Sequence, residues 1–250
     1  MNRSSTIVAA EPAEVRASPE LHAYFTFHRL RYGVLLSTCD DLITPGQTSP
    51  AILDVGPFIQ TALIRDRYPR IRVDTMGFGD ERFVGRGGEA HFEVDLNRPP
   101  GTTTEPSSTY DVVVLAEVLE HLRVSPVATL HRLGSYLAPG GHLVVQTPNA
   151  CAVHKRLAML VGRNPFQIIE GDDAMAGDLG HIREFTVDEL VTLGARAGLD
   201  VRSWLTANYF DAGGLQHRIF TAIGRGLPPR LRDGITIDYR RAAAPPVSAK

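Results

Sequence analysis

Two glutamates and a histidine lie close together near the middle of the chain, at Glu117, Glu120 and His121. If the chain turns helical at Ala116, this spacing places all three side chains on one helical face. Two carboxylates and an imidazole on one face can bind a divalent cation, or they can move a proton near neutral pH. The sequence therefore predicts that the chemistry of the protein is concentrated here.

The cluster follows directly after an apolar run, Asp111-Val-Val-Val-Leu115. A continuous valine-rich run is typical of a strand that is buried on both faces of a parallel sheet. Open α/β sheets bind their ligands beyond the carboxyl ends of the strands. The other elements are therefore expected to build a pocket above this strand end.

Strand-like and helix-like segments alternate along the chain, separated by Pro- and Gly-rich turns. A repeated strand–helix–strand order predicts an α/β fold, with a parallel sheet covered by helices on both faces. The predicted strands are residues 51–55, 70–73, 90–94, 111–115, 142–146, 201–205 and 235–239, and the predicted helices are 19–42, 59–68, 126–137, 150–161, 187–197 and 213–223.

We expect a single domain over residues 19–240, with a flexible N-terminal arm at 1–18 and a flexible tail at 241–250. Residues 19–44 form a predicted helical cap. Residues 162–180 have little periodicity, several glycines and several acidic side chains, among them Glu170, Asp172 and Asp173, so they are interpreted as a mobile lid over a site.

The composition favours a soluble cytoplasmic protein. The 26 basic and 28 acidic residues give a net charge of −2, which argues against a nucleic-acid-binding surface as the main feature. Two cysteines make no disulfide framework. No apolar run approaches the ~18 residues of a membrane span, so no membrane partner is expected.

Five motifs together resemble the class I S-adenosylmethionine-dependent methyltransferases. They are Ile52-Leu-Asp-Val-Gly-Pro57, the acids Asp74 and Asp95, the Asp111 strand, and Leu137-Ala-Pro-Gly-Gly-His-Leu-Val-Val145. The resemblance covers roughly residues 51–239. It implies a Rossmann-like seven-stranded sheet with helices on both faces, a last strand that is antiparallel, and S-adenosylmethionine as the cofactor.

By this resemblance, Asp54, Gly56 and Pro57 lie beside the methionine part of the cofactor, and Arg31 contacts its carboxylate. Gly56 allows a sharp turn and a close backbone approach. The sequence departs from the family after this glycine, because Phe58 replaces a usually small residue. The departure leaves two outcomes open: a loop that bends differently and still binds, or lost binding.

The resemblance also assigns the adenosine contacts. Asp74 matches the acid that binds the ribose hydroxyls, with Asp80 as its rival, and Asp95 with Leu96 matches the adenine contact. The predicted cofactor-binding set is completed by two residues after the fourth strand, Ala116 and Glu117.

The Glu117-Val-Leu-Glu-His121 motif is similar to that of metal-assisted O-methyltransferases, including ubiquinone-pathway and small-RNA 2′-O-methyltransferases. A second histidine, in His181-Ile-Arg-Glu-Phe-Thr186, strengthens the likeness. It implies that Glu117, Glu120, His121 and His181 bind Mg²⁺ or Mn²⁺, and that Glu120, His121 and His181 are catalytic. In the alternative without metal, Glu117 contacts the cofactor and His121 or His181 is the general base.

The predicted activity is methyl transfer to a hydroxyl of a small-molecule acceptor. A saccharide is the first choice, because two further stretches, Gly77–Phe83 and Leu231–Ile235, resemble methyltransferases of saccharide assembly, among them the methylmannose-polysaccharide type. The alternatives are an RNA 2′-O-methyltransferase and a catalytically inactive binding module of the same fold. A homodimer is a possible assembly.

Overall fold

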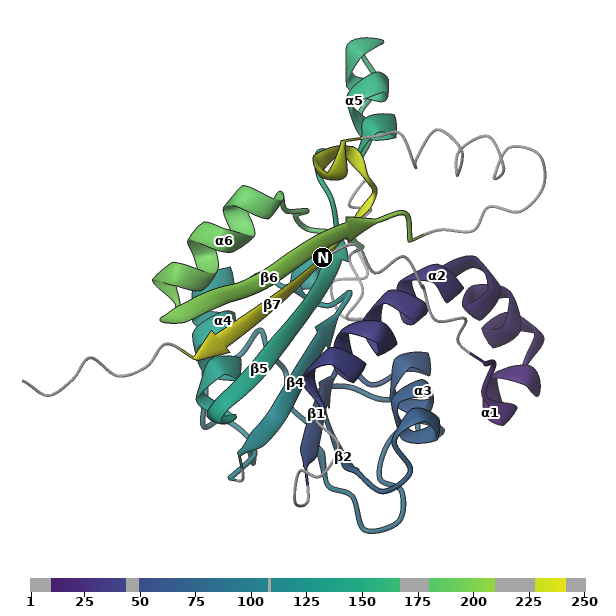
Figure 1. Cartoon of the computed structure of the whole chain (residues 1–250), viewed down its shortest axis with the longest axis vertical. Coiled ribbons are helices and arrows are strands. Elements are labelled where there is room, and N and C mark those ends of the chain that lie inside the picture. The colour runs from purple at the N-terminus through teal and green to yellow at the C-terminus, as the bar shows by residue number, and fades with distance from the viewer. Residues whose placement is uncertain (1–9, 44–49, 108, 167–179, 210–227, 242–250) are drawn as a thin grey trace, which may run out of the picture.

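The computed structural model describes residues 10–43, 50–107, 109–166, 180–209 and 228–241. Figure 1 shows a twisted sheet with helices on both sides. Within the described residues, no helix has both the length and the apolar character needed to cross a membrane.

Seven strands form one sheet in the order β3-β2-β1-β4-β5-β7-β6. Strands β1 to β5 are parallel, whereas β7 is antiparallel to both β5 and β6. The predicted Rossmann-like α/β sheet with an antiparallel last strand is therefore confirmed. The strand bounds are β1 Ala51–Val55, β2 Arg72–Met76, β3 His91–Phe92, β4 Tyr110–Ala116, β5 Leu137–Pro148, β6 Leu199–Ala207 and β7 Gly234–Arg241.

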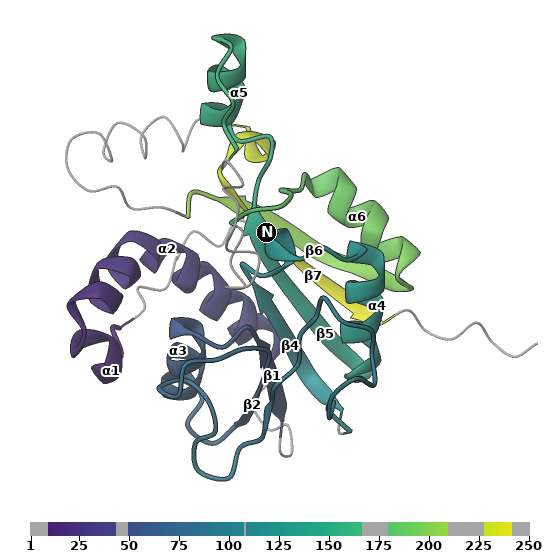
Figure 2. The same ribbon diagram turned by 180° about the vertical axis from the view of Figure 1, so that it is seen from behind.

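Helices cover the two faces of the sheet and bury two separate apolar cores. Helices α2 and α3 pack on one face, and α4 and α6 pack on the other, as the front and back views show (Figures 1 and 2). Successive strand residues point to opposite faces, so Ile52 belongs to the core beneath α2 and α3, and Leu53 to the core beneath α4 and α6. The helices are α1 Ala13–Arg16, α2 Pro19–Leu42, α3 Ile59–Arg67, α4 Pro126–Ser135, α5 Val153–Leu160 and α6 Val187–Arg196, with short 3₁₀ turns η1 Leu119–His121 and η3 Pro229–Leu231.

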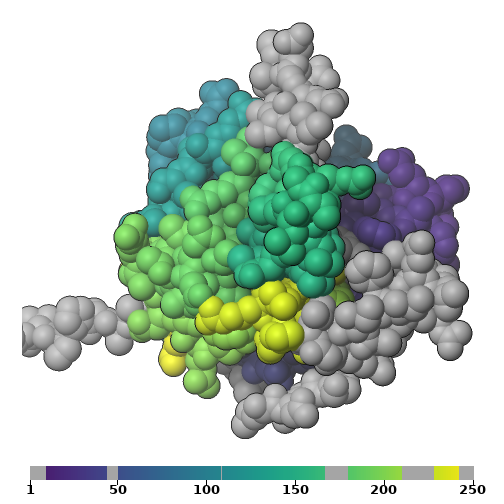
Figure 3. Space-filling model, turned by 90° about the horizontal axis from the view of Figure 1, so that it is seen from above, coloured from purple at the N-terminus to yellow at the C-terminus, as the bar shows by residue number. Residues whose placement is uncertain are grey.

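Local sequence signals define two of the helix starts. Ser18 accepts a hydrogen bond from the Leu21 amide at the start of α2. Thr186 and Glu189 form the capping box of α6, in which each side chain accepts from the other residue's amide. Helix α5 is different: it lies on the surface beside η3 (Figure 3), with Leu160 and Val161 strongly exposed.

The predicted boundaries need one correction. Residues 13–16 were expected to belong to a flexible arm, but they form α1, which packs on α2 and buries Val15 completely. Most of the predicted lid, the predicted helix at 213–223 and residues 242–250 of the tail lie outside the described residues.

The carboxyl ends of β1 and β2 approach each other and the turn after β4 very closely. Gly56 has a φ of 78°, and a Cβ added there would lie 2.5 Å from Val118 Cγ2. Gly77 has a φ of 113°, and its added Cβ would lie 3.4 Å from the Gly56 nitrogen. Both glycines therefore occupy positions where a side chain would be strained and crowded.

We predict that Gly56→Ala destabilises the protein for two separable reasons. The left-handed backbone costs about 1–2 kcal/mol, and the contact with Val118 adds about 1–3 kcal/mol. In a Val118→Ala background, only the first cost should remain. The free energy of unfolding in denaturant, measured for the four members of this double-mutant cycle, checks it. Equal costs of Gly56→Ala in both backgrounds would contradict the predicted steric contact.

Candidate active site

The turn after β4 differs from its predicted conformation. Glu117 has a φ of 56°, in the left-handed region, and the helical turn begins only at Leu119. A helix starting at Ala116 is therefore wrong, and Glu117 does not share a helical face with Glu120 and His121. The cause is local: the Glu117 amide extends the sheet ladder by donating to the Gln146 carbonyl, so the chain must turn sharply afterwards.

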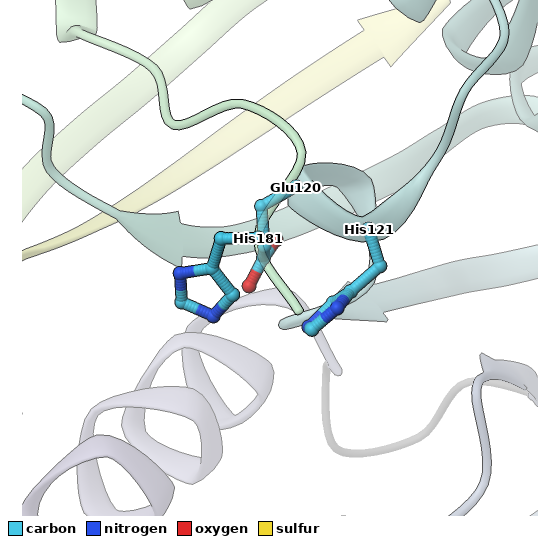
Figure 4. Close-up of side chains that lie close together, drawn as sticks. All are labelled: Glu120, His121 and His181. Atoms are coloured by element: carbon cyan, nitrogen blue, oxygen red, sulfur yellow. The ribbon is translucent and has the colours of Figure 1, made fainter. Parts of the chain in front are cut away.

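The structure brings Glu120, His121 and His181 together. One potential ligand atom from each lies within 4.8 Å of the others. The two imidazole rings are 4.9 Å apart between centroids and nearly perpendicular. Figure 4 shows both rings beside the Glu120 carboxylate. Glu117 is not a member of this group, which separates one of the four predicted metal ligands from the other three.

His181 reaches this position because its segment is bound to η1. The Ile182 and Arg183 amides both donate to the Glu120 carbonyl, at 2.8 and 3.2 Å. His121 Nδ1 lies 3.0 Å from the Gly180 carbonyl oxygen. The site is thus assembled from two segments that are about 60 residues apart in the sequence.

Glu120 is a buried carboxylate with unused hydrogen-bonding capacity. Its side chain is fully buried, and Oε2 accepts from the Thr147 hydroxyl at 3.0 Å. Oε1 has no hydrogen-bond partner among the described residues. Burial, and then repulsion by Glu117, raise the pKa of Glu120 well above its usual value. Such a site suits either a proton or a cation. One carboxylate with two imidazoles can bind a divalent transition-metal cation such as Mn²⁺, whereas Mg²⁺ prefers oxygen ligands.

Glu117 instead pairs with Arg31, which projects from α2. The Arg31 Nη1–Glu117 Oε2 distance is 3.2 Å; the Arg31 side chain is buried, and that of Glu117 is 14% exposed. Burial alone would lower the pKa of Arg31, but the Glu117 carboxylate raises it overall. Glu117 Oε1 and Arg31 Nε have no hydrogen-bond partners among the described residues. Buried atoms of opposite charge with spare capacity fit a zwitterionic group, such as the amino-acid end of a methionine derivative.

A buried polar network behind this pair was missed by the sequence analysis. Gln146 Nε2 donates to the Thr236 hydroxyl at 3.0 Å and to the Arg31 carbonyl at 3.4 Å. The Tyr209 hydroxyl hydrogen-bonds Thr236, and its ring packs over Gly234. These residues come from α2, β5, β7 and the residues after β6, and no local spacing links them.

Asp54, Gly56 and Pro57 lie at the end of β1, as predicted. Asp54 is fully buried and accepts from the Thr61 hydroxyl of α3 at 2.5 Å, whereas its Oδ1 has no partner among the described residues. Burial raises the pKa of Asp54 to about 7, although hydrogen bonds from Thr61 and Gln60 oppose the change. Phe58, the departure from the family pattern, starts α3, and its amide donates to the Thr61 hydroxyl.

The prediction that Asp74 ends the second strand is wrong. Strand β2 continues to Met76, so Asp74 lies in the middle of this strand, where it pairs with Leu53 of β1. Its two oxygens accept from the Ala90 amide and the Tyr110 hydroxyl, both at 2.9 Å. A buried acid engaged in this way fastens three chain segments together. It does not lie at the strand end where a ribose would bind.

The other candidates for the adenosine end lie beyond the strands. Asp80 follows the end of β2 and pairs with Arg82, in the loop that begins at Gly77. Asp95 lies three residues beyond β3, and its carboxylate accepts from the Asn97 amide. The neighbouring Leu96 and the last β4 residue, Ala116, are both 8% exposed.

Comparison with known proteins identifies the family. A family model described as "Methyltransferase domain" matches residues 38–203, which is more than half of the chain. The chain belongs to this methyltransferase family. Within it, the protein is a class I S-adenosylmethionine-dependent methyltransferase, an enzyme of the fold described above.

Individual relatives are more distant. The methyltransferase is 29% identical over 209 residues to a trans-aconitate 2-methyltransferase of Methylobacterium radiotolerans, covering 78% of each chain. Its fold is similar to that of the N-methyltransferase NodS of Bradyrhizobium japonicum, solved with S-adenosylhomocysteine (TM-score 0.51, 13% identity, 93% of both chains). It is also similar to a Clostridium acetobutylicum methyltransferase (TM-score 0.56, 9% identity, 89% of this chain and 97% of that chain).

We predict that Asp54→Asn removes a pH-dependent loss of stability. The pKa of Asp54 rises from 3.8 to about 7 on folding, so the folded state holds this proton more tightly and stability falls as pH rises between these values. Relative to wild type, the variant should gain on the order of 2–3 kcal/mol between about pH 5 and about pH 8. Denaturant titration at both pH values checks this.

The control is Asp200→Asn, which changes an exposed acid on β6. If wild type and Asp54→Asn lost stability in parallel as pH rose, the burial of an ionising Asp54 would not be the cause.

Proposed function

We propose that this methyltransferase transfers the methyl group of S-adenosylmethionine to a hydroxyl oxygen of a small, neutral acceptor, with a divalent cation at the histidine site. The observation that carries this proposal is the cluster of Glu120, His121 and His181 within 4.8 Å of one another. A hydroxyl is a weak nucleophile until its proton is removed, and this cluster offers groups that can remove it.

The chemistry of the cluster also argues against a carboxylate acceptor, such as the one named by the trans-aconitate enzyme. A carboxylate is already ionised at neutral pH and needs no base. It would need cationic side chains to hold it, yet Arg31 is paired with Glu117, and Lys155 is paired with Glu184. The same argument disfavours RNA, with its charged backbone.

The cofactor would lie over the carboxyl ends of β1 and β4. S-adenosylmethionine supplies an activated methyl group on a sulfonium. In this proposal the Arg31–Glu117 pair and Asp54 hold its amino-acid end, with Gly56 and Pro57 allowing close approach. Because Asp74 is buried inside β2, Asp80 is the better candidate for the ribose contact: it lies beyond the strand end, where its partly exposed carboxylate pairs with Arg82. Asp95 with Leu96 is proposed for adenine.

The cation would be held by Glu120, His121 and His181. When bound, Mg²⁺ or Mn²⁺ would lower the pKa of an acceptor hydroxyl. Glu117 is left out of the proposed ligand set, because its carboxylate is committed to Arg31. Without a cation, the two imidazoles remain the candidate bases, because a neutral imidazole has a ring nitrogen that can accept the proton of the acceptor hydroxyl.

A sugar hydroxyl is the proposed acceptor. The support comes from the acidic character of the site, which suits a neutral polyol, and from the resemblance of residues 77–83 and 231–235 to saccharide methyltransferases. Methyl transfer to a panel of mono- and oligosaccharides, quinols, short RNAs and trans-aconitate tests this choice. If trans-aconitate were the only compound in the panel that became methylated, the proposal of a sugar acceptor would be rejected.

We predict that chelation abolishes turnover, that Mn²⁺ or Mg²⁺ restores it, and that Glu120→Gln cannot be restored. Cation binding requires Glu120 to lose its proton, so affinity for the cation should fall as pH is lowered. Calorimetric titration of the protein with Mn²⁺, together with radiolabelled methyl transfer, measures both effects. The matched control is Glu20→Gln, an exposed glutamate on α2. Full turnover in chelator would reject the cation.

We predict that His121→Ala lowers kcat by about 100- to 10,000-fold while S-adenosylhomocysteine binds with wild-type affinity. His121 belongs to the proposed acceptor side of the site, whereas the proposed cofactor contacts are Arg31, Asp54 and Glu117. His131→Asn, on the exposed face of α4, is the control histidine. Loss of cofactor binding in His121→Ala would show that the η1 turn is structural.

A further inference from the structure

His181, Glu184 and Lys155 form a line of contacting, largely buried side chains. Neither Glu184 nor Lys155 belongs to the predicted site. His181 Nδ1 is 3.2 Å from Glu184 Oε1, and the other Glu184 oxygen accepts from Lys155 Nζ. The Lys155 and Glu184 side chains are only 9% and 5% exposed, and that of His181 is 21% exposed. Lys155 comes from α5, so this line joins α5 to the active site.

The backbone holds both ends of this line in place. Asn149 bridges to Phe185, and the Ala150 amide donates to the Phe185 carbonyl. Lys155 Nζ also donates to the Asn149 carbonyl at 3.3 Å. Glu184 therefore lies in a segment that is tied to the end of β5, and its carboxylate contacts Lys155 and His181.

The contact with Glu184 determines where a neutral His181 carries its hydrogen. An ionised carboxylate only accepts hydrogen bonds, so Nδ1 must carry the hydrogen, and Nε2 is then the nitrogen with the lone pair. The Gly180 carbonyl imposes the same arrangement on His121, because a carbonyl also only accepts. Both rings would thus present the nitrogen type that can bind a cation or take a proton. Figure 4 shows the two rings beside Glu120.

We propose that Glu184 is a positioning residue that fixes the ring orientation and the Nδ1–H tautomer of His181, and that Lys155 holds Glu184 for this task. The inference rests on the proposed function, in which His181 faces the acceptor. Carboxylate partners of this kind commonly orient histidines that bind metals. A purely structural ion pair between α5 and this segment would stabilise the fold without affecting the His181 tautomer.

The test is the ¹⁵N spectrum of the histidine rings in the full-length protein, without added metal, at about pH 8, where free imidazole is neutral. The His181 signals are assigned by their loss in His181→Asn. In wild type we expect a protonated Nδ1 and an unprotonated Nε2. In Glu184→Gln, whose amide can donate or accept, we expect a mixture with Nε2–H. The control is Asp188→Asn, which removes the exposed ion pair with Arg230.

A second variant guards against misfolding, because Glu184→Gln leaves Lys155 buried without its partner. The double variant Lys155→Met/Glu184→Gln removes both charges and should show the same loss of the Nδ1–H tautomer with a wild-type circular dichroism spectrum. A wild-type tautomer in either variant overturns the proposal.

Binding of Mn²⁺ gives an independent readout. Its affinity should fall by about 10- to 100-fold in Glu184→Gln, while the affinity for S-adenosylhomocysteine stays at the wild-type value. Wild-type Mn²⁺ affinity in Glu184→Gln overturns the proposal. If wild type itself binds no Mn²⁺, the cation of the proposed function fails, and the tautomer measurement still decides the role of Glu184.

Discussion

The two hydrogen bonds from the Ile182 and Arg183 amides to the Glu120 carbonyl are the constraint on which the site depends. They attach a segment before α6 to the turn after β4. Together with the bond from the Ala150 amide to the Phe185 carbonyl and the contact of His121 with Gly180, they bring His181 beside His121. Backbone bonds are well suited to this task, because they position the segment whatever the side chains do, and so leave the Glu120 carboxylate available for chemistry.

Two features lower the free-energy cost of burying the Glu120 carboxylate. A buried carboxylate with one unused oxygen is costly unless something neutralises it. Thr147 satisfies one oxygen, and the raised pKa of Glu120 lets a proton satisfy the other. A cation could replace that proton. An ionised Glu120 carboxylate is unfavourable in this buried position unless a positive charge lies beside it. This is the physical basis of the proposed cation site.

The fold could be predicted from the sequence, because its signals are local and strong. The valine-rich run before Ala116 and the turns rich in Pro and Gly indicate alternating strands and helices, whereas the seven-stranded sheet with its antiparallel last strand was implied by the family resemblance. The conformation of the site could not be predicted as well. A three- and four-residue spacing suggested one helical face, but a single sheet bond from the Glu117 amide keeps the chain extended one residue too long for that. The prediction for Asp74 was wrong for a related reason. The sequence does not distinguish an acid inside a strand from an acid at the end of a strand, and only the structure shows that Asp74 contacts Ala90 and Tyr110.

The two acids after β4 illustrate how one short motif can serve two tasks. Glu117 turns toward α2, where its carboxylate forms an ion pair with Arg31. Glu120 turns toward the histidines and has no such cation among the described residues. The two neighbouring carboxylates therefore lie in different environments: Glu117 lies beside a guanidinium and Glu120 beside two imidazoles. In this enzyme the left-handed Glu117 backbone is what separates them: a regular helix from Ala116 would place both acids on one face and force them to share one environment. The φ of 56° at Glu117 thus accompanies a turn in which one carboxylate contacts Arg31 and the other lies beside the two histidines.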